Sequence, residues 1–268
     1  MFRLRDFLLS SASLGVSQVL TAFVGFVFWF IAAHTFTQSE VGIASAVVSG
    51  ISLVGALGVM GLGTLLIHDI PRHPGREMGM IAASLAASAA IGGLLGLAFV
   101  GAAPYLSTDL TSVRTSVIMV LIVAFGAGLT SASLVIDQAV IGLMRSSLQL
   151  ARNVLAAVSR LALLATFGLV GVASGSLAIP GAWVASIALS MLALAAYSAR
   201  RGSLRRVYPL HWDFLGARRT SALKHHLLNL AIQVPGWAMP LIAVAVLSAR
   251  TTAGFYFAWL LVGLASFV

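Results

Sequence analysis

Charged residues are scarce in this chain of 268 residues: Asp, Glu, Lys and Arg make up 9% of it, against 60% for hydrophobic residues. Soluble domains carry about 25% charged residues, because their surfaces face water. Cysteine is absent, which excludes disulfides, thiolate metal sites and cysteine nucleophiles. The shortage of charge argues against a water-soluble fold and indicates that the membrane is the solvent of this chain.

Apolar stretches of helix length follow one another along the sequence. A bilayer core about 30 Å thick needs roughly 20 apolar residues in a helix, and these stretches are continuous, unlike the alternating strands of a membrane barrel. We therefore predict an all-α, polytopic transmembrane helix bundle. The expected helices are Ser13–Thr35, Val41–Ile67, Met78–Ala103, Val117–Leu143, Leu150–Val172, Ile179–Ala199, Leu227–Ala249 and Thr252 to the end.

Basic residues divide unevenly between the two sides of this topology. With the N-terminus in the cytoplasm, only Arg114 and Arg250 fall on the outer side of the membrane, which is a strong positive-inside signal. The basic segment at 200–224 is expected to contact anionic membrane lipids. The cations lie in short clusters between apolar stretches rather than along a polar face with interleaved aromatics, which argues against nucleic-acid binding.

Two predicted helices begin in a similar way. Ser39–Ala46 and Thr251–Ala258 each place a polar turn before small residues at four-residue spacing, with Gly42 and Gly254 at an offset of 212. Repeats with the same direction indicate two halves related by an axis along the membrane normal. We expect a six-helix lobe at 1–199, a basic cytoplasmic loop at 200–226 and the first two helices of a second lobe at 227–268. Because the last stretch has 17 residues and no polar flank, we expect a truncated helix from a longer protein.

Few ionisable side chains interrupt the apolar stretches. Asp137 is the one acid within the apolar part of a predicted helix, so it needs a cation or a wet cavity beside it. Arg160 lies about 15 Å along its helix from the expected membrane boundary at Leu150, at 1.5 Å per residue. A guanidinium at that depth suits a phosphate or pyrophosphate, with pairing to Asp137 as the structural alternative. Both arrangements could alternate during a transport cycle.

Two further groups of polar residues complete the candidate site. Arg152 and Asn153 share the helical stripe of Arg160, although Arg152 could instead extend to the headgroups. Gln233 precedes Pro235 and Pro240, which should kink their helix and free backbone carbonyls. The histidines show no metal-ligand spacing. The candidate substrate-binding residues are therefore Arg160, Arg152, Asn153, Asp137 and Gln233, with no catalytic residue, metal or cofactor expected.

The run Gly25–Gly63, with its Phe-Trp-Phe-Ile-Ala-Ala-His-Thr-Phe-Thr-Gln-Ser-Glu-Val-Gly turn, resembles the opening hairpin of bacterial polysaccharide-biosynthesis membrane proteins. Asp137–Leu155 and Asn229–Ala258 are similar to further parts of the same family. These proteins are the lipid-linked oligosaccharide, or O-antigen, flippases of the multidrug/oligosaccharidyl-lipid/polysaccharide exporter superfamily. The similarity extends over nearly the whole chain through apolar motifs.

The resemblance implies a V-shaped transporter of 12 to 14 helices in two lobes. It would move an undecaprenyl-pyrophosphate-linked glycan across the bacterial cytoplasmic membrane, for cell-surface polysaccharide such as lipopolysaccharide. Cations in the central cavity of family members meet the pyrophosphate, which makes Arg160 and Arg152 the candidates here. A glycan polymerase or glycosyltransferases are the further partners that this pathway implies.

Three alternatives remain open from the sequence. A drug or cation antiporter of the same superfamily would need buried carboxylates, of which Asp137 is the obvious one. A membrane glycan-assembly enzyme would need acids or bases beside its substrate, whereas the predicted outer loops contain only Glu40 and Asp109 as acids. A scaffold for a glycan-synthesis complex is the third. Transport is favoured over all three, and we do not expect an enzyme.

Overall fold

A computed structural model describes residues 23–171, 174–201 and 219–265 of the chain. The described residues form helices joined by short turns, and no strand occurs among them. This confirms the predicted all-α bundle. The helices are Phe23–Thr35, α2 (Gln38–Gly58), α3 (Leu62–Asp69), α4 (Glu77–Leu106), α5 (Thr111–Thr115), α6 (Val117–Gly142), α7 (Ser146–Val170), α8 (Gly175–Arg200), α10 (Arg219–Val246) and α11 (Ala249–Ala265), with 3-10 turns at Ile70–Arg72 and Thr108–Leu110.

Six of the described helices are long and apolar enough to cross a membrane: α2, α4, α6, α7, α8 and most of α10. The shortest of them, α2, has 21 residues, which at 1.5 Å per residue matches a bilayer core about 30 Å thick. The chain is therefore a multi-pass membrane protein. Two helices are shorter in the described part of the chain, Phe23–Thr35 and α11 with 17 residues. The predicted start at Ser13 lies outside the described residues.

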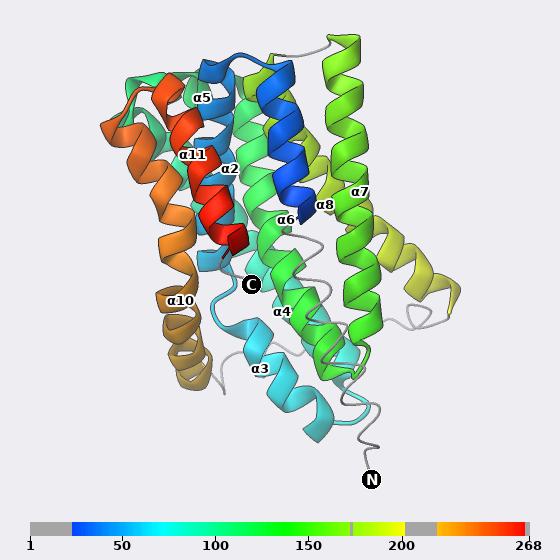
Figure 1. Ribbon diagram of the computed structural model, residues 1–268. Helices are drawn as coiled ribbons and strands as arrows, with labels where there is room; N and C mark the ends of the chain where they lie inside the picture. Colours follow the sequence, from blue (N-terminus) through cyan, green and yellow to red (C-terminus); the bar gives the residue numbers. More distant parts are fainter. Residues whose placement is uncertain (1–22, 172–173, 202–218, 266–268) are drawn as a thin grey trace.

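Helix α2 is the central element of the bundle. It packs against α4, α6 and α8 on one side and against α10 and α11 on the other, as Figure 1 shows. Val47 and Ile51 of α2 are fully buried, and they join Val123 of α6 and Val244 of α10 in one apolar cluster. The last two helices, α10 and α11, are thus part of the same packed bundle as the helices that precede them.

The prediction of one continuous helix over Val41–Ile67 is wrong, because helix α2 ends at Gly58. Met60 and Gly61 adopt positive φ values of 50° and 72°, in a region that glycine occupies without strain and a helix interior does not use. The chain then starts the separate helix α3 at Leu62. This break turns α3 away from α2 at the lower end of the bundle (Figure 1).

Helix α10 contains Pro235 and Pro240, as expected, and continues through both. Proline has no N–H, so Pro240 cannot donate to the carbonyl of Gly236 four residues earlier. The indole Nε1 of Trp259 in α11 donates to this carbonyl instead, at 3.3 Å. The freed carbonyl therefore has a protein neighbour, which ties α10 to α11.

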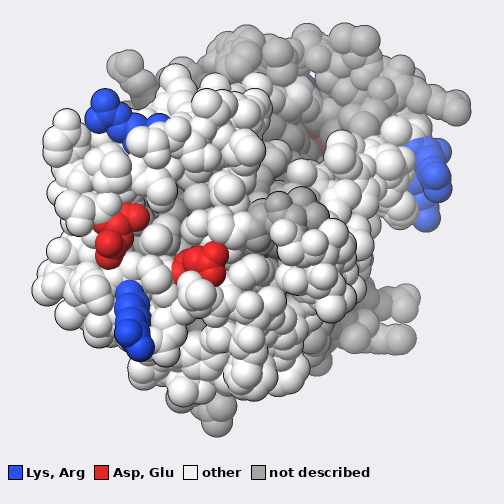
Figure 2. Space-filling view, turned by 90° about the horizontal axis from the view of Figure 1, so that it is seen from above, with Lys and Arg blue, Asp and Glu red and all other residues white. Residues whose placement is uncertain are grey.

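Charged side chains are sparse at the upper end of the bundle. Figure 2, seen from that end, shows a few acidic and basic groups among uncharged residues. Two acids there bind the starts of other helices: Glu40 accepts from the N–H of Gly175, and Asp109 accepts from the N–H of Ala249, each at 2.8 Å. Carboxylates are favourable at helix N-termini, where unpaired N–H groups and the helix dipole are positive. These contacts hold the starts of α8 and α11 in place.

The two hairpins that suggested a repeat have the same local form. Each consists of a helix, a two-residue turn and a second helix, at Phe23–Thr35 with α2 and at α10 with α11. Thr37 and Ser248 occupy matching positions, because the Oγ of each accepts from the N–H three residues later. This match gives an offset of 211 residues (37 and 248), one less than the sequence motif indicated. Both second helices run downward side by side in Figure 1.

Small residues allow close packing where the sequence predicted it. A Cβ on Gly42 would lie 1.8 Å from the carbonyl oxygen of Ala249, so α2 and α11 approach until no side chain fits between them. A Cβ on Gly92 would lie 2.1 Å from the Oγ of Ser131, at the contact of α4 with α6. Such packing stabilises membrane helices, because the bilayer supplies little hydrophobic force for their association.

Candidate functional site

The turn between α6 and α7 brings Asp137 and Arg152 together. The two helices run antiparallel and are joined by only three residues, 143–145. Residues at similar distances before and after such a turn lie opposite each other. Asp137 is six residues before Leu143 and Arg152 is seven after Arg145, so their side chains meet about two helical turns from the end of the hairpin.

Asp137 and Arg152 form a two-pronged ion pair. The Nε of Arg152 donates to one carboxylate oxygen at 2.9 Å, and one terminal nitrogen donates to the other at 2.5 Å. The side chains are only 4% exposed for Arg152 and 15% for Asp137, so the pair is buried. This parallel geometry is the strongest that a guanidinium makes with a carboxylate.

Polar neighbours use the remaining donors of Arg152. Its terminal nitrogens donate to Ser133 Oγ at 2.8 Å, to Asn153 Oδ1 at 2.9 Å and to Ser190 Oγ at 3.4 Å. The guanidinium is thus surrounded by α6, α7 and α8, with all of its nitrogens engaged. This arrangement makes Arg152 a structural cross-link between three helices, and it leaves no donor directed at a ligand.

Arg160 lies two turns further along α7, near the middle of that helix, and its surroundings differ. Its guanidinium carbon lies 3.5 Å from the centre of the Trp183 ring and 6.0 Å from the centre of the Phe28 ring. Its Nε donates to Ser186 Oγ at 3.3 Å. Within the described part of the chain, no carboxylate forms an ion pair with Arg160.

Aromatic side chains from three helices surround Arg160. Phe28 packs edge to face against both Trp29 and Trp183, and Trp29 packs in the same manner against Tyr256 of α11, with ring centres 4.7 Å apart. The Tyr256 hydroxyl is within hydrogen-bonding reach of Ser49 in α2. The site therefore joins the first hairpin, α7 and α8 to α11, the second helix of the second predicted lobe.

The contact of Arg160 with the Trp183 ring determines the direction of the guanidinium N–H groups. A guanidinium attracted to a ring face by its charge keeps its N–H groups in its own plane, pointing away from the ring. No described residue accepts from the two terminal nitrogens of Arg160. These nitrogens are the groups that make paired, charge-assisted hydrogen bonds to phosphate oxygens. The terminal nitrogens of Arg160 are therefore the donors in this cluster that an anion could engage.

The structure separates the five predicted site residues into three places. Arg152, Asn153 and Asp137 share one buried cluster, and Arg160 stands apart in the aromatic cluster. The pairing of Asp137 with Arg160, which the sequence left open as a structural alternative, does not occur, because Arg152 binds the carboxylate. Gln233 is exposed and lines a small crevice of about 40 Å³ between α10, α3 and α6, where Asn229 donates to Thr64 at 3.1 Å.

Sequence reasoning missed the side chains that give Arg160 its setting, namely Trp183, Phe28 and Tyr256. A signal for one of them was present. Trp183 and Ser186 are three residues apart and share a helix face, in the helix that follows that of Arg160 along the chain. The contribution of Tyr256 depends on tertiary packing alone.

Histidines and acids form no group that could hold a metal ion within the described residues. His68 contacts Asp69 at 2.6 Å through Nδ1 and also contacts Arg72, beside the 3-10 turn that follows α3. Buried Asp69 and half-exposed His68 thus form a local network at one end of the bundle. This network is far along the chain from α7 and shares no described contact with Arg160.

Comparisons with known proteins add no family to this description. No family model, curated protein or solved structure matches the chain. A functional conclusion therefore depends on the chemistry of the polar residues inside the bundle. Among these residues, the guanidinium of Arg160 is the most informative about function.

Proposed function

We propose that the protein is an integral membrane transporter that flips a lipid-linked oligosaccharide across the cytoplasmic membrane of a bacterium. The substrate would be an undecaprenyl-pyrophosphate-linked glycan used for cell-surface polysaccharide such as lipopolysaccharide. In this proposal the N-terminus is cytoplasmic, and the described cations at 72, 76, 145, 200, 201 and 224 lie on the cytoplasmic side. The resemblance of the first hairpin to the flippase family supports this assignment.

Arg160 is the single observation that carries the proposal. A cation near the middle of a membrane helix costs about 2.5–3.5 kcal/mol on insertion scales, and such residues mark ligand pathways when they lack a structural partner. Arg160 has one hydrogen bond and two aromatic neighbours, and no described carboxylate neutralises it. A pyrophosphate would supply the missing negative charge. The aromatic rings around it suit the apolar faces of sugars or an isoprenoid chain.

The state of Asp137 weighs against the drug or cation antiporter. Such a transporter needs a membrane-embedded carboxylate that is free to exchange cations. Asp137 is the acid that lies well inside a described membrane helix, and both of its oxygens accept from Arg152. The carboxylate is thus committed to holding α6 and α7 together, so an anionic substrate agrees better with the geometry.

Translocation of a fluorescent polyprenyl-pyrophosphate oligosaccharide by the full-length gene product in liposomes tests the proposal. We expect Arg160→Ala to reduce the initial rate about 10- to 100-fold, because a hydrogen-bonded charge pair contributes roughly 1.5–3 kcal/mol. Arg160→Lys should retain part of the rate, since it keeps the charge and loses the paired geometry. Arg114→Ala, which removes an exposed cation of α5, is the matched control and should leave the rate unchanged. Wild-type translocation by Arg160→Ala would refute the proposal.

A further inference from the structure

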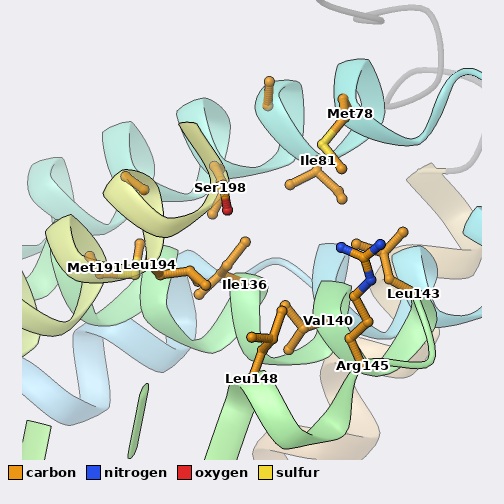
Figure 3. Close-up of a pocket in the computed structure, with 13 residues that line it drawn as sticks. Met78, Ile81, Ile136, Val140, Leu143, Arg145, Leu148, Met191, Leu194 and Ser198 are labelled. Carbon is orange, nitrogen blue, oxygen red and sulfur yellow. The ribbon is translucent and has the colours of Figure 1, made fainter. Parts of the chain in front are cut away.

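A groove lies between α4 and α8 at the end of the bundle opposite α5, with α6 as its floor. Its volume is about 360 Å³, within the range of sites that bind small molecules. All 13 lining residues except Arg145 and Ser198 are apolar. Figure 3 shows Arg145 at one end of the groove and Met191 and Leu194 at the other. The groove is thus an apolar channel with a cation at one end.

The ends of three helices define the mouth of this groove. Met78 is the second residue of α4, Arg145 directly precedes α7, and Ser198 is two residues before the end of α8. Since these helices cross the membrane, their ends lie at the depth of the lipid headgroups. The groove therefore runs from headgroup level toward the bilayer interior.

The groove is separate from the site around Arg160. On α6, Ile136 and Val140 line the groove, whereas Asp137 turns toward Arg152 on another face. No residue of the aromatic cluster lines the groove. The flanking helices also present apolar side chains outward: Leu192 of α8 is 65% exposed and Leu94 of α4 is 66% exposed. Exposed leucines of this kind on both helices suit contact with hydrocarbon.

Arg145 gives the groove its charge preference. The side chain is exposed, and no acid of the described residues forms an ion pair with it. Its guanidinium points over the groove beside Leu143 in Figure 3. An arginine at headgroup depth attracts acidic lipid and can bind a phosphate through two parallel hydrogen bonds.

We propose that this groove is a specific site for an anionic phospholipid, with one acyl chain lying along α6 between α4 and α8 and the phosphate at Arg145. The apolar lining accounts for the chain and the single cation accounts for the acidic headgroup. The site is distinct from the proposed transport site and does not depend on the identity of the transported substrate.

Native mass spectrometry of the purified full chain, titrated with phosphatidylglycerol or with phosphatidylcholine of the same chains, tests this site. Ala82 lines the groove and Ala86, one turn later on α4, is exposed outside it. We expect Ala82→Phe to lower phosphatidylglycerol binding at least about fivefold by filling the groove, and Ala86→Phe to leave it unchanged. A photoreactive acyl chain should cross-link to residues 78–85 or 191–198.

The charge of Arg145 is tested separately. Arg145→Gln should reduce the preference for phosphatidylglycerol over phosphatidylcholine about fivefold, the effect of one basic residue at an anionic surface. Phosphatidylcholine should lose less affinity, because choline balances the charge of its phosphate. Arg145→Lys should keep most of the preference. Equal effects of Ala82→Phe and Ala86→Phe, equal binding of the two lipids by the wild type, or displacement of the cross-link to other residues would each overturn the proposal.

Discussion

Removing either partner of the Asp137–Arg152 pair is the most informative perturbation of the bundle, because the two partners should respond unequally. Asp137→Leu leaves a guanidinium that is 4% exposed without its counter-ion. Arginine cannot lose its proton in proteins, so this charge has no route to neutrality. Arg152→Met leaves a carboxylate, which can take up a proton and become neutral.

The structure sets the magnitudes. Breaking a buried pair by removing one partner costs about 3–5 kcal/mol, whereas replacing both partners with apolar residues of similar size is often close to neutral. We expect Asp137→Leu to cost about 3–5 kcal/mol of unfolding free energy and Arg152→Met to cost about 1–3 kcal/mol, the range for an unsatisfied buried group. The double variant should cost less than Asp137→Leu alone. Three further contacts of Arg152, to Ser133, Asn153 and Ser190, also lose their partner.

The assay is unfolding of the purified protein in mixed detergent micelles, followed by tryptophan fluorescence as the denaturing detergent is increased. The four species of the double-mutant cycle give the coupling between the two residues, which we expect to exceed about 2 kcal/mol. Arg114→Met on the exposed surface of α5 provides the control and should change little.

Additive effects in this cycle would refute the reasoning, as would an Asp137→Leu variant as stable as the wild type. Exchange of the two residues, Asp137→Arg with Arg152→Asp, provides a second test. If the pair acts only as a cross-link of the helices, the exchanged protein should recover part of the stability that either single change removes. A coupling role in transport would instead leave the exchanged protein stable and inactive.

Two other predictions concern the packing of the last two helices. Gly42→Leu should prevent the close contact of α2 with α11 and lower the melting temperature strongly. Gly254→Leu should be tolerated, because a Cβ at that position meets nothing within 4 Å. Equal melting temperatures of the two variants would contradict the close packing of α2 with α11. Trp259→Phe should cost about 1–3 kcal/mol by leaving the carbonyl freed by Pro240 without a donor. Adding Pro240→Ala should remove most of that cost, because alanine restores the donor within the helix, and unfolding that shows no such rescue would contradict the account.

The class of fold was predictable because the membrane imposes a simple rule. A helix satisfies all its backbone hydrogen bonds internally, so hydrophobic length alone indicates where membrane helices lie. The break at Met60 and Gly61 escaped prediction because an apolar stretch continues on both sides of it. Hydropathy does not register a change of backbone direction. The three closely spaced glycines at positions 58, 61 and 63 are the sequence signal that indicates this break in the helix.

The ionisable residues of the candidate site could be identified from the sequence, whereas their pairing and their aromatic neighbours could not. A charge inside an apolar helix stands out, which is how Asp137 and Arg160 were found. The partner of Asp137 follows from the α6–α7 turn, because Arg152 lies seven residues after that turn and Asp137 six residues before it. Gln233 was grouped with the others for its polarity, although packing around the crevice of α10 and α3 places it elsewhere.

Binding of a polyprenyl pyrophosphate to the purified, full-length protein in detergent tests the central claim most directly. Titration calorimetry of the wild type, Arg160→Ala and Arg114→Ala compares a variant of the proposed anion site with a control cation. We expect the dissociation constant to rise at least about tenfold for Arg160→Ala, as a lost charge-assisted hydrogen-bond pair would cause, and to stay constant for Arg114→Ala. Equal affinity of all three proteins would contradict the assignment of Arg160 as the pyrophosphate-binding residue.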